Sequence, residues 1–416
     1  MPFFLHTHFL KEAKMARKKG EDNLDSFFTS MAQSTGGDVL NEIDSVKYFV
    51  DSGNLAINYI CSGRFIDGGI PGGKLTEIFG PSSSSKSLVG SNILYGCQKS
   101  GGIPILLDCE NSANKEFIKK ASHCDLKKII RYTPESLEEA FSKQYKAIDY
   151  IRENKGKDLP IAIVYDSISV SPSARELREV ELPDGYSQAD FKRIVGGHEQ
   201  PGERAKICSR ELRKLNSVME KNNATVVILN QIRMKIGTYG NPETTAGGGA
   251  ALEFYASCRL RTQTLKKIEE KISAKSSRTL GVYVRVQNRK NKAHRPFVST
   301  DNVQLLFEHG INPVSGLLTC LLDARKIEQK SAGNFIVMPE VADGKEITFK
   351  ASLERNDVPV DVLLKCPALI DAKTEQEVSD YLAPFANVLN YSNSKDVVET
   401  EVKNEEEEEL LDAELN

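Results

Sequence analysis

The chain has 416 residues, of which 40% are hydrophobic and 27% charged, and this length predicts two or three domains. No run of eighteen apolar residues is present, which argues against a membrane-spanning protein, and the eight cysteines include no Cys-x-x-Cys pair, which argues against zinc and disulfide frameworks and favours a reducing cytoplasm. The net charge of −3 is uneven, because residues 395–416 hold ten Asp/Glu against two Lys/Arg and leave a body with 53 basic and 48 acidic residues.

The N-terminal region predicts a small helical element. The apolar start of residues 1–20 is too short, and too interrupted by histidines, for the core of a signal peptide. Residues 24–51 then carry apolar side chains near helical spacing, and Gly36 and Gly37 divide them into two short helices.

From Gly63 onward, short apolar strands alternate with helical patterns. The predicted strands are LTEIFG (75–80), IPILLD (103–108), IAIVYD (161–166), TVVILN (225–230) and VYVRVQN (282–288). Buried strands joined by helical crossovers predict an α/β fold with a mostly parallel sheet and helices on both faces.

The first strand runs into a phosphate-loop motif. The segment from Gly80 to Ser87 matches G-x-x-x-x-G-K-[ST] except that Ser85 replaces the second glycine. In such a loop, backbone N–H groups surround the phosphates, Lys86 reaches the terminal phosphates and Ser87 holds magnesium. A serine-rich linker ending in Lys-Ser is the alternative. The nucleotide-binding residues predicted here are Gly80, Pro81, Ser82, Ser83, Ser84, Ser85, Lys86, Ser87 and Leu88.

Acidic residues follow two neighbouring strands, where a nucleotide site needs them. Asp108 and Glu110 end the second strand, and Asp166 ends the third. We expect Asp166, with Ser87, to organise Mg²⁺, and Glu110 to polarise the attacking water as a general base. Taken singly, each is also consistent with an ordinary acid that caps a helix.

Two further loops are candidates for ligand binding. The strand TVVILN ends at Asn230 and Gln231, amides that can sense a third phosphate, and the loop after it contains Arg233, Lys235 and Gly247–Gly249. Residues 171–204 predict a long loop with one short helix. Taken alone, the loop after TVVILN is more consistent with a flexible surface connection, and a loop as long as residues 171–204 is usually functional or disordered.

The later part of the chain is marked by charge. Residues 255–300 carry twelve Lys/Arg and two Asp/Glu, a composition that suits a polyanionic partner or, alternatively, a solvated face. Past Gly310 a smaller mixed segment runs to about residue 393. The final acidic tail is expected to be disordered.

The segment NQIRMKIGTYGNPETTAGGGAALEFYASCRL closely resembles the second DNA-binding loop and following helix of the RecA recombinases. The resemblance extends over Gly63–Gly310 and includes the phosphate loop, ILLDCEN, IVYDS and NRKNKAHRPF. It implies a RecA-like core that binds ATP with Mg²⁺ at a subunit interface and hydrolyses it in a DNA-dependent way. It also implies helical homo-oligomeric filaments on single-stranded DNA, exchange with homologous double-stranded DNA, and a role in DNA repair, with single-strand-binding and loader proteins as candidate partners.

The resemblance also assigns individual residues. It implies ATP contacts for Lys86 and Ser87, a metal role for Asp166, catalysis by Glu110 and ATP sensing by Gln231. It further implies adenine stacking by Phe117, interface packing by Phe254, contacts with the neighbouring subunit's ATP by Lys290 and Lys292, and DNA binding by the loop that holds Arg233, Lys235, Gly247, Gly248 and Gly249.

Several departures from the bacterial pattern bear on these expectations. Ser85 and GINPVSGLL (310–318) are similar to phage-type RecA-like proteins, and the serine bears on turnover more than on ATP binding. Glu253 stands where bacterial members have lysine, and the first DNA loop matches too little for any residue to be carried over. The acidic tail resembles family tails that compete with DNA.

The predicted organisation has four parts: an N-terminal arm and helical polymerisation element (1–60), the ATPase and DNA-binding core (61–310), a smaller α+β domain (311–393) and a disordered acidic tail (394–416). We expect a cytoplasmic protein of a bacterial cell or a phage-infected host. The alternatives are a hexameric helicase of the same superfamily, a weakly hydrolysing nucleotide-gated scaffold and, least consistent with the paired lysines, a metabolic kinase.

Overall fold

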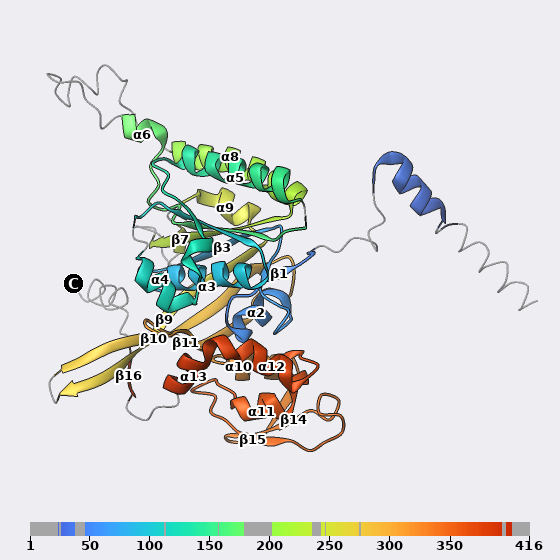
Figure 1. Cartoon of the computed structure of the whole chain (residues 1–416), viewed down its shortest axis with the longest axis vertical. Helices are drawn as coiled ribbons and strands as arrows, with labels where there is room; N and C mark the ends of the chain where they lie inside the picture. The colour runs from blue at the N-terminus through green and yellow to red at the C-terminus, as the bar shows by residue number, and fades with distance from the viewer. Residues whose placement is uncertain are drawn as a thin grey trace, which may run out of the picture. The chain divides into compact units, whose positions relative to one another are not determined.

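The structure, a computed structural model, describes residues 24, 26–37, 46–111, 114–156, 158–178, 202–234, 243–245, 247–273, 276–392 and 397–401 (Figure 1). It divides into two compact units, Met1–Lys47 and Tyr48–Asn416, which are described separately. The four-part division predicted from the sequence stays a prediction.

In the first unit, residues 26–35 form a helix. Leu24, Phe27, Phe28 and Met31 are more than half exposed, and their spacing places them on one side of that helix. The predicted second helix falls largely on residues 38–45, which lie outside the described residues. The prediction that this second helix extends to residue 51 is wrong, because Phe49–Val50 form strand β1. The β-branched Val50 is buried there and pairs with Ile70 of β2 (Ile70–Pro71).

The second unit is built on a large sheet with the strand order β12-β11-β10-β9-β3-β7-β6-β4-β5. The strands are β3 (Leu75–Gly80), β4 (Ile103–Asp108), β5 (Ile130–Tyr132), β6 (Ile161–Asp166), β7 (Ala224–Met234), β9 (Cys258–Ser273), β10 (Ser276–Asn291), β11 (Ser299–Leu306) and β12 (Gly310–Ile311). Neighbours from β5 to β9 pair in parallel and those from β9 to β12 antiparallel. The predicted α/β class with a mostly parallel sheet is confirmed.

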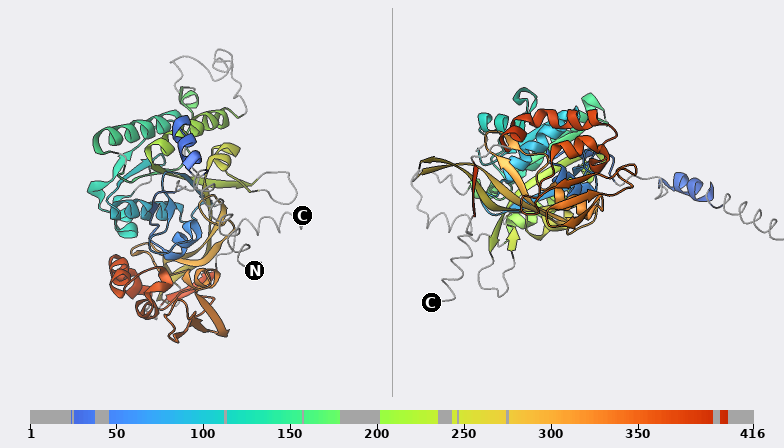
Figure 2. Two further views of the ribbon diagram at one scale, coloured as in Figure 1. Left: turned by 90° about the vertical axis from the view of Figure 1, so that its right-hand side faces the viewer. Right: turned by 90° about the horizontal axis from the view of Figure 1, so that it is seen from below.

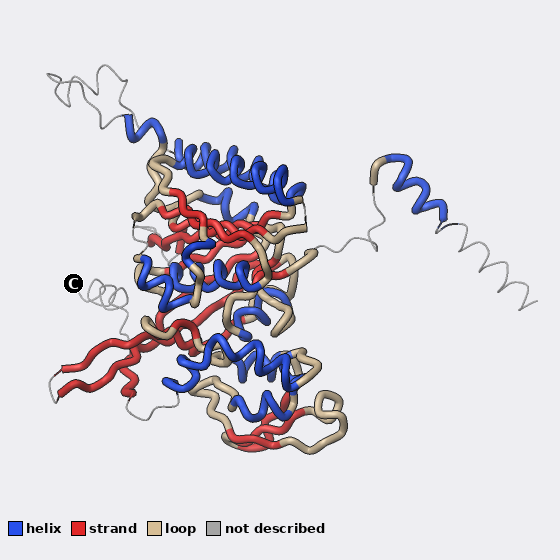
Figure 3. The backbone as a smooth tube through the Cα atoms, in the orientation of Figure 1, coloured by secondary structure: helices blue, strands red, loops and turns tan. Residues whose placement is uncertain are grey.

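Helices cover both faces of the parallel strands (Figures 1 and 3). The sheet has one hydrophobic core on each face, and successive residues of β6 point into different cores. Ile163 packs with α5 and α8 on one face, and Val164 packs with α3 on the other. The helices around these strands are α3 (Lys86–Lys99), α4 (Lys115–Ser122), α5 (Leu137–Lys155), α6 (Ala174–Arg178), α8 (Glu203–Asn222), α9 (Gly249–Tyr255) and the 3₁₀ turn η2 (Leu126–Lys128). Described residues contain no helix that combines the length and hydrophobicity of a membrane span.

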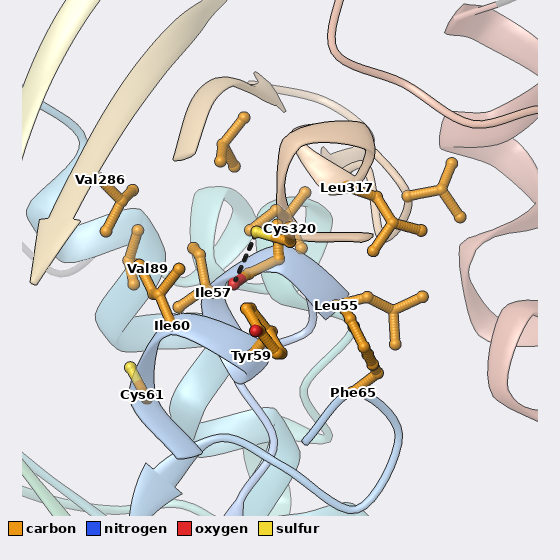
Figure 4. Close-up of a cluster of buried hydrophobic side chains, with 14 of the residues drawn as sticks. Leu55, Ile57, Tyr59, Ile60, Cys61, Phe65, Val89, Val286, Leu317 and Cys320 are labelled. Atoms are coloured by element: carbon orange, nitrogen blue, oxygen red, sulfur yellow. Dashed lines mark hydrogen bonds between the residues drawn. The ribbon is translucent and has the colours of Figure 1, made fainter. Parts of the chain in front are cut away.

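The helix α2 (Leu55–Ser62) ties the core to the C-terminal segment. All eight of its residues are buried, and the Asn54 side chain caps it by accepting a hydrogen bond from the Ile57 N–H. Figure 4 shows Leu55, Ile57 and Tyr59 in one apolar cluster with Leu317 of α10 (Leu317–Asp323), where the Cys320 thiol donates to the Ala56 carbonyl at 3.8 Å. All eight cysteines are free thiols.

The C-terminal segment is a smaller mixed layer, coloured orange to red in Figure 2. It contains a three-stranded sheet of β13 (Ile327–Ser331), β14 (Asn334–Val337) and β15 (Thr348–Lys350). Its helices are α11 (Val360–Lys365), α12 (Glu375–Leu382) and α13 (Ala386–Ser392), with 3₁₀ turns η3 (Pro367–Ile370) and η4 (Ala383–Phe385). The last described strand, β16 (Val397–Glu401), lies within the predicted tail and pairs antiparallel with β9.

Candidate functional site

The predicted phosphate loop lies between β3 and α3. The strand ends at Gly80 and the helix begins at Lys86, so the strand–loop–helix order that such a loop requires is present. Ser85, the residue that replaces the loop glycine, adopts a left-handed conformation with φ 63° and ψ 21°. Its side chain makes no capping hydrogen bond. Ser85 therefore adopts a backbone conformation that glycine adopts more readily. The N–H groups of the first turn of α3 have no partner within the helix and favour binding of an anion.

The Lys86 side chain folds back over the loop. Its Nζ donates to the carbonyls of Gly80 at 3.1 Å and Pro81 at 2.5 Å, and to the Ser84 Oγ at 3.4 Å. Burial lowers the pKa of Lys86 to about 8, although the nearby carboxylates of Asp166 and Glu110 oppose this shift. The ammonium therefore stands among neutral acceptors, where a phosphate would be a stronger partner.

The structure brings the predicted carboxylates to one edge of the sheet. Asp108 and Asp166 are register partners on β4 and β6. Burial raises the pKa of Asp166 to about 6, against a hydrogen bond from Ser87, and the charges of Glu110 and Asp108 raise the pKa further. A half-buried carboxylate beside a hydroxyl fits Mg²⁺, an ion that uses one or two carboxylates and takes its other ligands from phosphates and water.

The two acids after β4 have different partners. Asp108 is buried, and its Oδ2 accepts from Arg131 Nε at 3.0 Å and Nη2 at 2.5 Å, so it is committed to an ion pair. Glu110 is exposed, and its Oε1 accepts a hydrogen bond from the Ser167 hydroxyl at 2.7 Å. Ser167 thus orients one oxygen of Glu110 and leaves the other for a water molecule.

The end of β7 lies directly beside the phosphate loop. Gln231 is the register partner of Gly80, and it is half-buried. The neighbouring Asn230 is fully buried, and its Oδ1 accepts from the N–H groups of Gln231 and Gly247, both at 3.0 Å. Asn230 therefore holds together the two ends of the loop that was predicted to contact DNA.

The described residues include only part of that loop. Gly247 is buried, Gly248 caps α9 with φ 80°, and Gly249 begins the helix. The backbone of Arg233 lies in β7, but its side chain is not among the described parts of the structure. Lys235 lies outside the described residues. The first loop yields α6 and the start of α8, while residues 179–201 lie outside the described residues.

The predicted interface residues gather around α9. The Lys290 Nζ donates to the carbonyls of Glu253 at 2.6 Å and Phe254 at 2.8 Å, and burial together with Lys292 lowers the pKa of Lys290. Lys292 is exposed, and the Phe254 side chain is 70% exposed.

Phe117, the residue predicted to stack on adenine, is half-buried on α4. Asn114 caps this helix by accepting a hydrogen bond from the Phe117 N–H.

Three site features were missed from the sequence. Ser167, which donates a hydrogen bond to Glu110, directly follows Asp166 at the end of its strand, and its position there was the available signal. Arg131 pairs with Asp108 from a short strand that was not predicted. Glu77 and Arg259 form a buried ion pair, and a charged residue inside the apolar strand LTEIFG was the available signal.

Comparisons with known proteins agree with this geometry. Residues 33–312 match the family model of the RecA N-terminal domain. Protein RecA of Trichodesmium erythraeum is 30% identical over 405 residues, covering 95% of this chain and 98% of that protein. Protein RecA of Thermus aquaticus is 31% identical over 317 residues, covering 74% of this chain and 84% of that protein.

Among solved structures, the RadB recombinase is 16% identical with a TM-score of 0.43, and the match covers 64% of this chain and all of that one. The extent of the family-model match and the coverage of the RecA relatives confirm the resemblance read from the motifs. The chain belongs to the RecA family of recombinases.

Proposed function

We propose that this protein hydrolyses ATP in a DNA-stimulated way, forms filaments on single-stranded DNA, and promotes homologous pairing and strand exchange in DNA repair. The observation that carries the proposal is the pairing of Gly80 with Gln231, because it sets the phosphate loop against the strand that leads into the candidate DNA loop. Membership of the RecA family supports the same reading.

In this proposal, Lys86 and the N–H groups at the start of α3 bind the ATP phosphates, while Ser87 and Asp166 hold Mg²⁺. The ion neutralises charge on the phosphates when bound. Glu110, oriented by Ser167, accepts a hydrogen bond from the attacking water and then its proton. Gln231 reports the third phosphate to the loop ending at Gly247.

The proposed contacts with DNA come from the loop after β7, and those with neighbouring subunits come from the residues around α9. Arg233, Lys235 and the amides of Gly247–Gly249 would contact the phosphates of single-stranded DNA. Lys290 and Lys292 would reach the ATP of the adjoining subunit, and the exposed Phe254 would pack across that interface. The N-terminal helix would add a second apolar contact between subunits.

The variant Lys86→Ala tests the nucleotide part of the proposal. We expect it to abolish ATP-dependent binding of a labelled oligonucleotide, measured by fluorescence anisotropy at moderate salt, because the Lys86 ammonium reaches the loop carbonyls and would pair with the phosphates there. Lys146→Ala, an exposed residue of α5, is the matched control and should bind normally. Unchanged DNA binding by Lys86→Ala would contradict the proposal.

Electron imaging with single-stranded DNA and a slowly hydrolysed ATP analogue tests assembly. Continuous helical filaments that require the nucleotide are the expected result, whereas closed rings would favour a hexameric helicase. The left-handed Ser85 keeps a second candidate, a weakly hydrolysing nucleotide-gated scaffold. Phosphate release that increases on addition of DNA would exclude that scaffold.

A further inference from the structure

A buried carboxylate lies in the middle of β3, three residues before the phosphate loop. Glu77 is completely buried, and both of its oxygens are occupied. Its Oε1 accepts from Asn230 Nδ2 at 2.9 Å, and its Oε2 accepts from Arg259 Nε at 2.5 Å. Burial raises the pKa of Glu77 against the opposing effect of Arg259, so a charge is held here at an energetic disadvantage.

On the nucleotide side, the Asn230 amide has no hydrogen-bonding capacity to spare. Besides its bond to Glu77, Nδ2 donates to the Gly247 carbonyl at 2.9 Å, and Oδ1 accepts from the N–H groups of Gln231 and Gly247. One side chain therefore contacts the sensing residue, the end of the candidate DNA loop and Glu77. A shift of Gln231 that moves Asn230 must break or stretch one of these bonds.

On the interface side, Arg259 carries the connection to α9. Its Nη1 donates to Glu253 Oε1 at 2.7 Å, and its guanidinium lies 4.6 Å from the centre of the Phe79 ring. Lys290 holds the carbonyls of Glu253 and Phe254 in the same helix. The hydrogen-bonded set of Asn230, Glu77, Arg259 and Glu253 thus runs without a gap from the phosphate sensor to the exposed Phe254 surface.

Packing alone does not explain this arrangement. A buried ion pair is weak evidence for stability, because apolar residues of similar volume often stabilise the same position equally well or better. A fully satisfied polar network has discrete arrangements, since moving one member leaves another unpaired, and this property suits a switch.

We propose that Glu77 is a positioning residue that couples the nucleotide state sensed at Gln231 to the loop ending at Gly247 and to α9 with Phe254. The inference rests on the proposed function, in which ATP controls DNA binding and subunit contact. Glu77 touches neither nucleotide nor DNA in this proposal, and it acts through Asn230 and Arg259.

The test uses Glu77→Gln in the full-length chain. A glutamine oxygen still accepts from Asn230, but its NH₂ faces the Arg259 Nε, so the bond to Arg259 is lost. We expect ATP affinity to stay within threefold of the parent protein, while the ATP-induced gain in single-stranded DNA affinity falls at least tenfold. Glu211→Gln, a mostly buried carboxylate on α8 outside this network, is the control and should keep that gain.

A readout without DNA separates this inference from the proposed function. We expect ATP and Mg²⁺ to slow amide hydrogen exchange in residues 247–255 of the parent protein and to leave exchange unchanged in Glu77→Gln. An ATP response in Glu77→Gln equal to that of the parent would overturn the inference. If the parent shows neither this response nor nucleotide-dependent DNA binding, the proposed function fails and the inference falls with it.

The double variant Glu77→Leu/Arg259→Met guards against an unfolding effect. Apolar replacement of both partners keeps packing, so we expect near-parental thermal stability and ATP affinity with the coupling still lost. If the double variant regains both parental stability and the ATP-induced gain in DNA affinity, Glu77 has only a structural role. A parallel loss of ATP affinity and coupling in both variants would lead to the same conclusion.

Discussion

At the scale of single residues, Ser85 makes a prediction about backbone strain. A non-glycine residue in the left-handed region costs roughly 1–2 kcal/mol, whereas glycine costs about 0.5–1 kcal/mol of backbone entropy on folding. Ser85 has a φ of 63°, and its side chain makes no capping hydrogen bond that a substitution would remove. We expect Ser85→Gly to raise the free energy of unfolding by up to about 1 kcal/mol, measured by urea denaturation.

Ser82 in the same loop supplies the matched control. It is exposed and is not among the positive-φ residues, so Ser82→Gly brings only the entropic penalty. We expect that variant to lose about 0.5–1 kcal/mol. Equal effects of the two substitutions would show that the left-handed conformation of Ser85 carries no strain.

Asp166 makes a prediction about pH. Its folded-state pKa of about 6 lies above the usual value of 3.8, so the folded state binds the proton more tightly than the unfolded state. The stability of the nucleotide-free protein should therefore fall as pH rises from about 4 through 6. Asp166→Asn removes this loss, and we expect it to raise the free energy of unfolding at pH 7.5 by about 2–3 kcal/mol.

Urea denaturation between pH 5 and pH 8 checks this expectation without ATP or Mg²⁺. The gap between Asp166→Asn and the parent should narrow toward pH 5, and Asp149→Asn, an exposed carboxylate of α5, should follow the parent throughout. A gap that stays constant with pH would rule out ionisation of Asp166 as its source.

Single residues could be predicted where their neighbours in sequence are their neighbours in space. Lys86 and Ser87 follow a strand within a short motif, and Asp166 ends a strand, so sheet geometry brings them together at the carboxyl edge. Arg259 lies 182 positions from Glu77 in the chain, and the sequence around either residue does not indicate that the two form an ion pair. A single sequence cannot supply such distant partners.

At the scale of elements, the N-terminal helix makes the next prediction. Its stripe of Leu24, Phe27, Phe28 and Met31 is exposed within its own unit, and burying an aromatic side chain is worth about 1.5–3 kcal/mol. If the stripe packs on a neighbouring subunit, Phe28→Glu should raise the protein concentration needed for half-maximal filament formation at least tenfold. ATP binding by the unassembled chain should be unchanged.

Light scattering during assembly on single-stranded DNA measures this effect. Gln33→Glu adds the same charge on the far side of the helix from the stripe and is the control, which we expect to assemble normally. Equal assembly by both variants would exclude the stripe as a subunit contact.

Elements with an apolar run were predictable, and those with mixed polarity were not. All five predicted strands form. Four of them are the buried apolar runs that a parallel sheet requires, and the fifth, residues 282–288, lies in the antiparallel β10, where buried and partly exposed residues alternate. The strand β9 was missed because charged and polar residues dominate its sequence from Arg259 to Ser273, and only the first part pairs with β3. Its partner β10 was predicted only over its apolar half.

At the scale of the whole molecule, the sequence predicts the class of fold but not the order of its strands. The Gly-rich loops and strand-end acids require a parallel sheet with one functional edge. The place of β9 beside β3, and the antiparallel extension that follows, depend on pairings between strands far apart in the chain. The attachment of β16 to β9 was likewise outside what composition could show, because the acidic charge around it indicated only disorder.

That attachment shapes the prediction for the acidic tail. β16 ends at Glu401, the register partner of Lys266, so the chain beyond it starts beside a hairpin on which Lys267 and Lys271 are exposed. Residues 402–416 contain seven acidic residues and one lysine. Negative charge tethered at this place should compete with DNA for basic surface, most strongly at low ionic strength.

Deleting residues 402–416 removes that charge and keeps β16. We expect single-stranded DNA to bind about threefold to tenfold more tightly at 50 mM salt, with the gain shrinking as salt rises and the salt dependence of binding becoming steeper. A full-length variant with the seven acids replaced by Gln or Asn should behave like the deletion, because the proposed effect is one of charge and not of length. If the deletion leaves the salt dependence of DNA binding unaltered, the tail does not compete with DNA, and the exposed lysines of the hairpin do not contribute to the DNA-binding surface that it would cover.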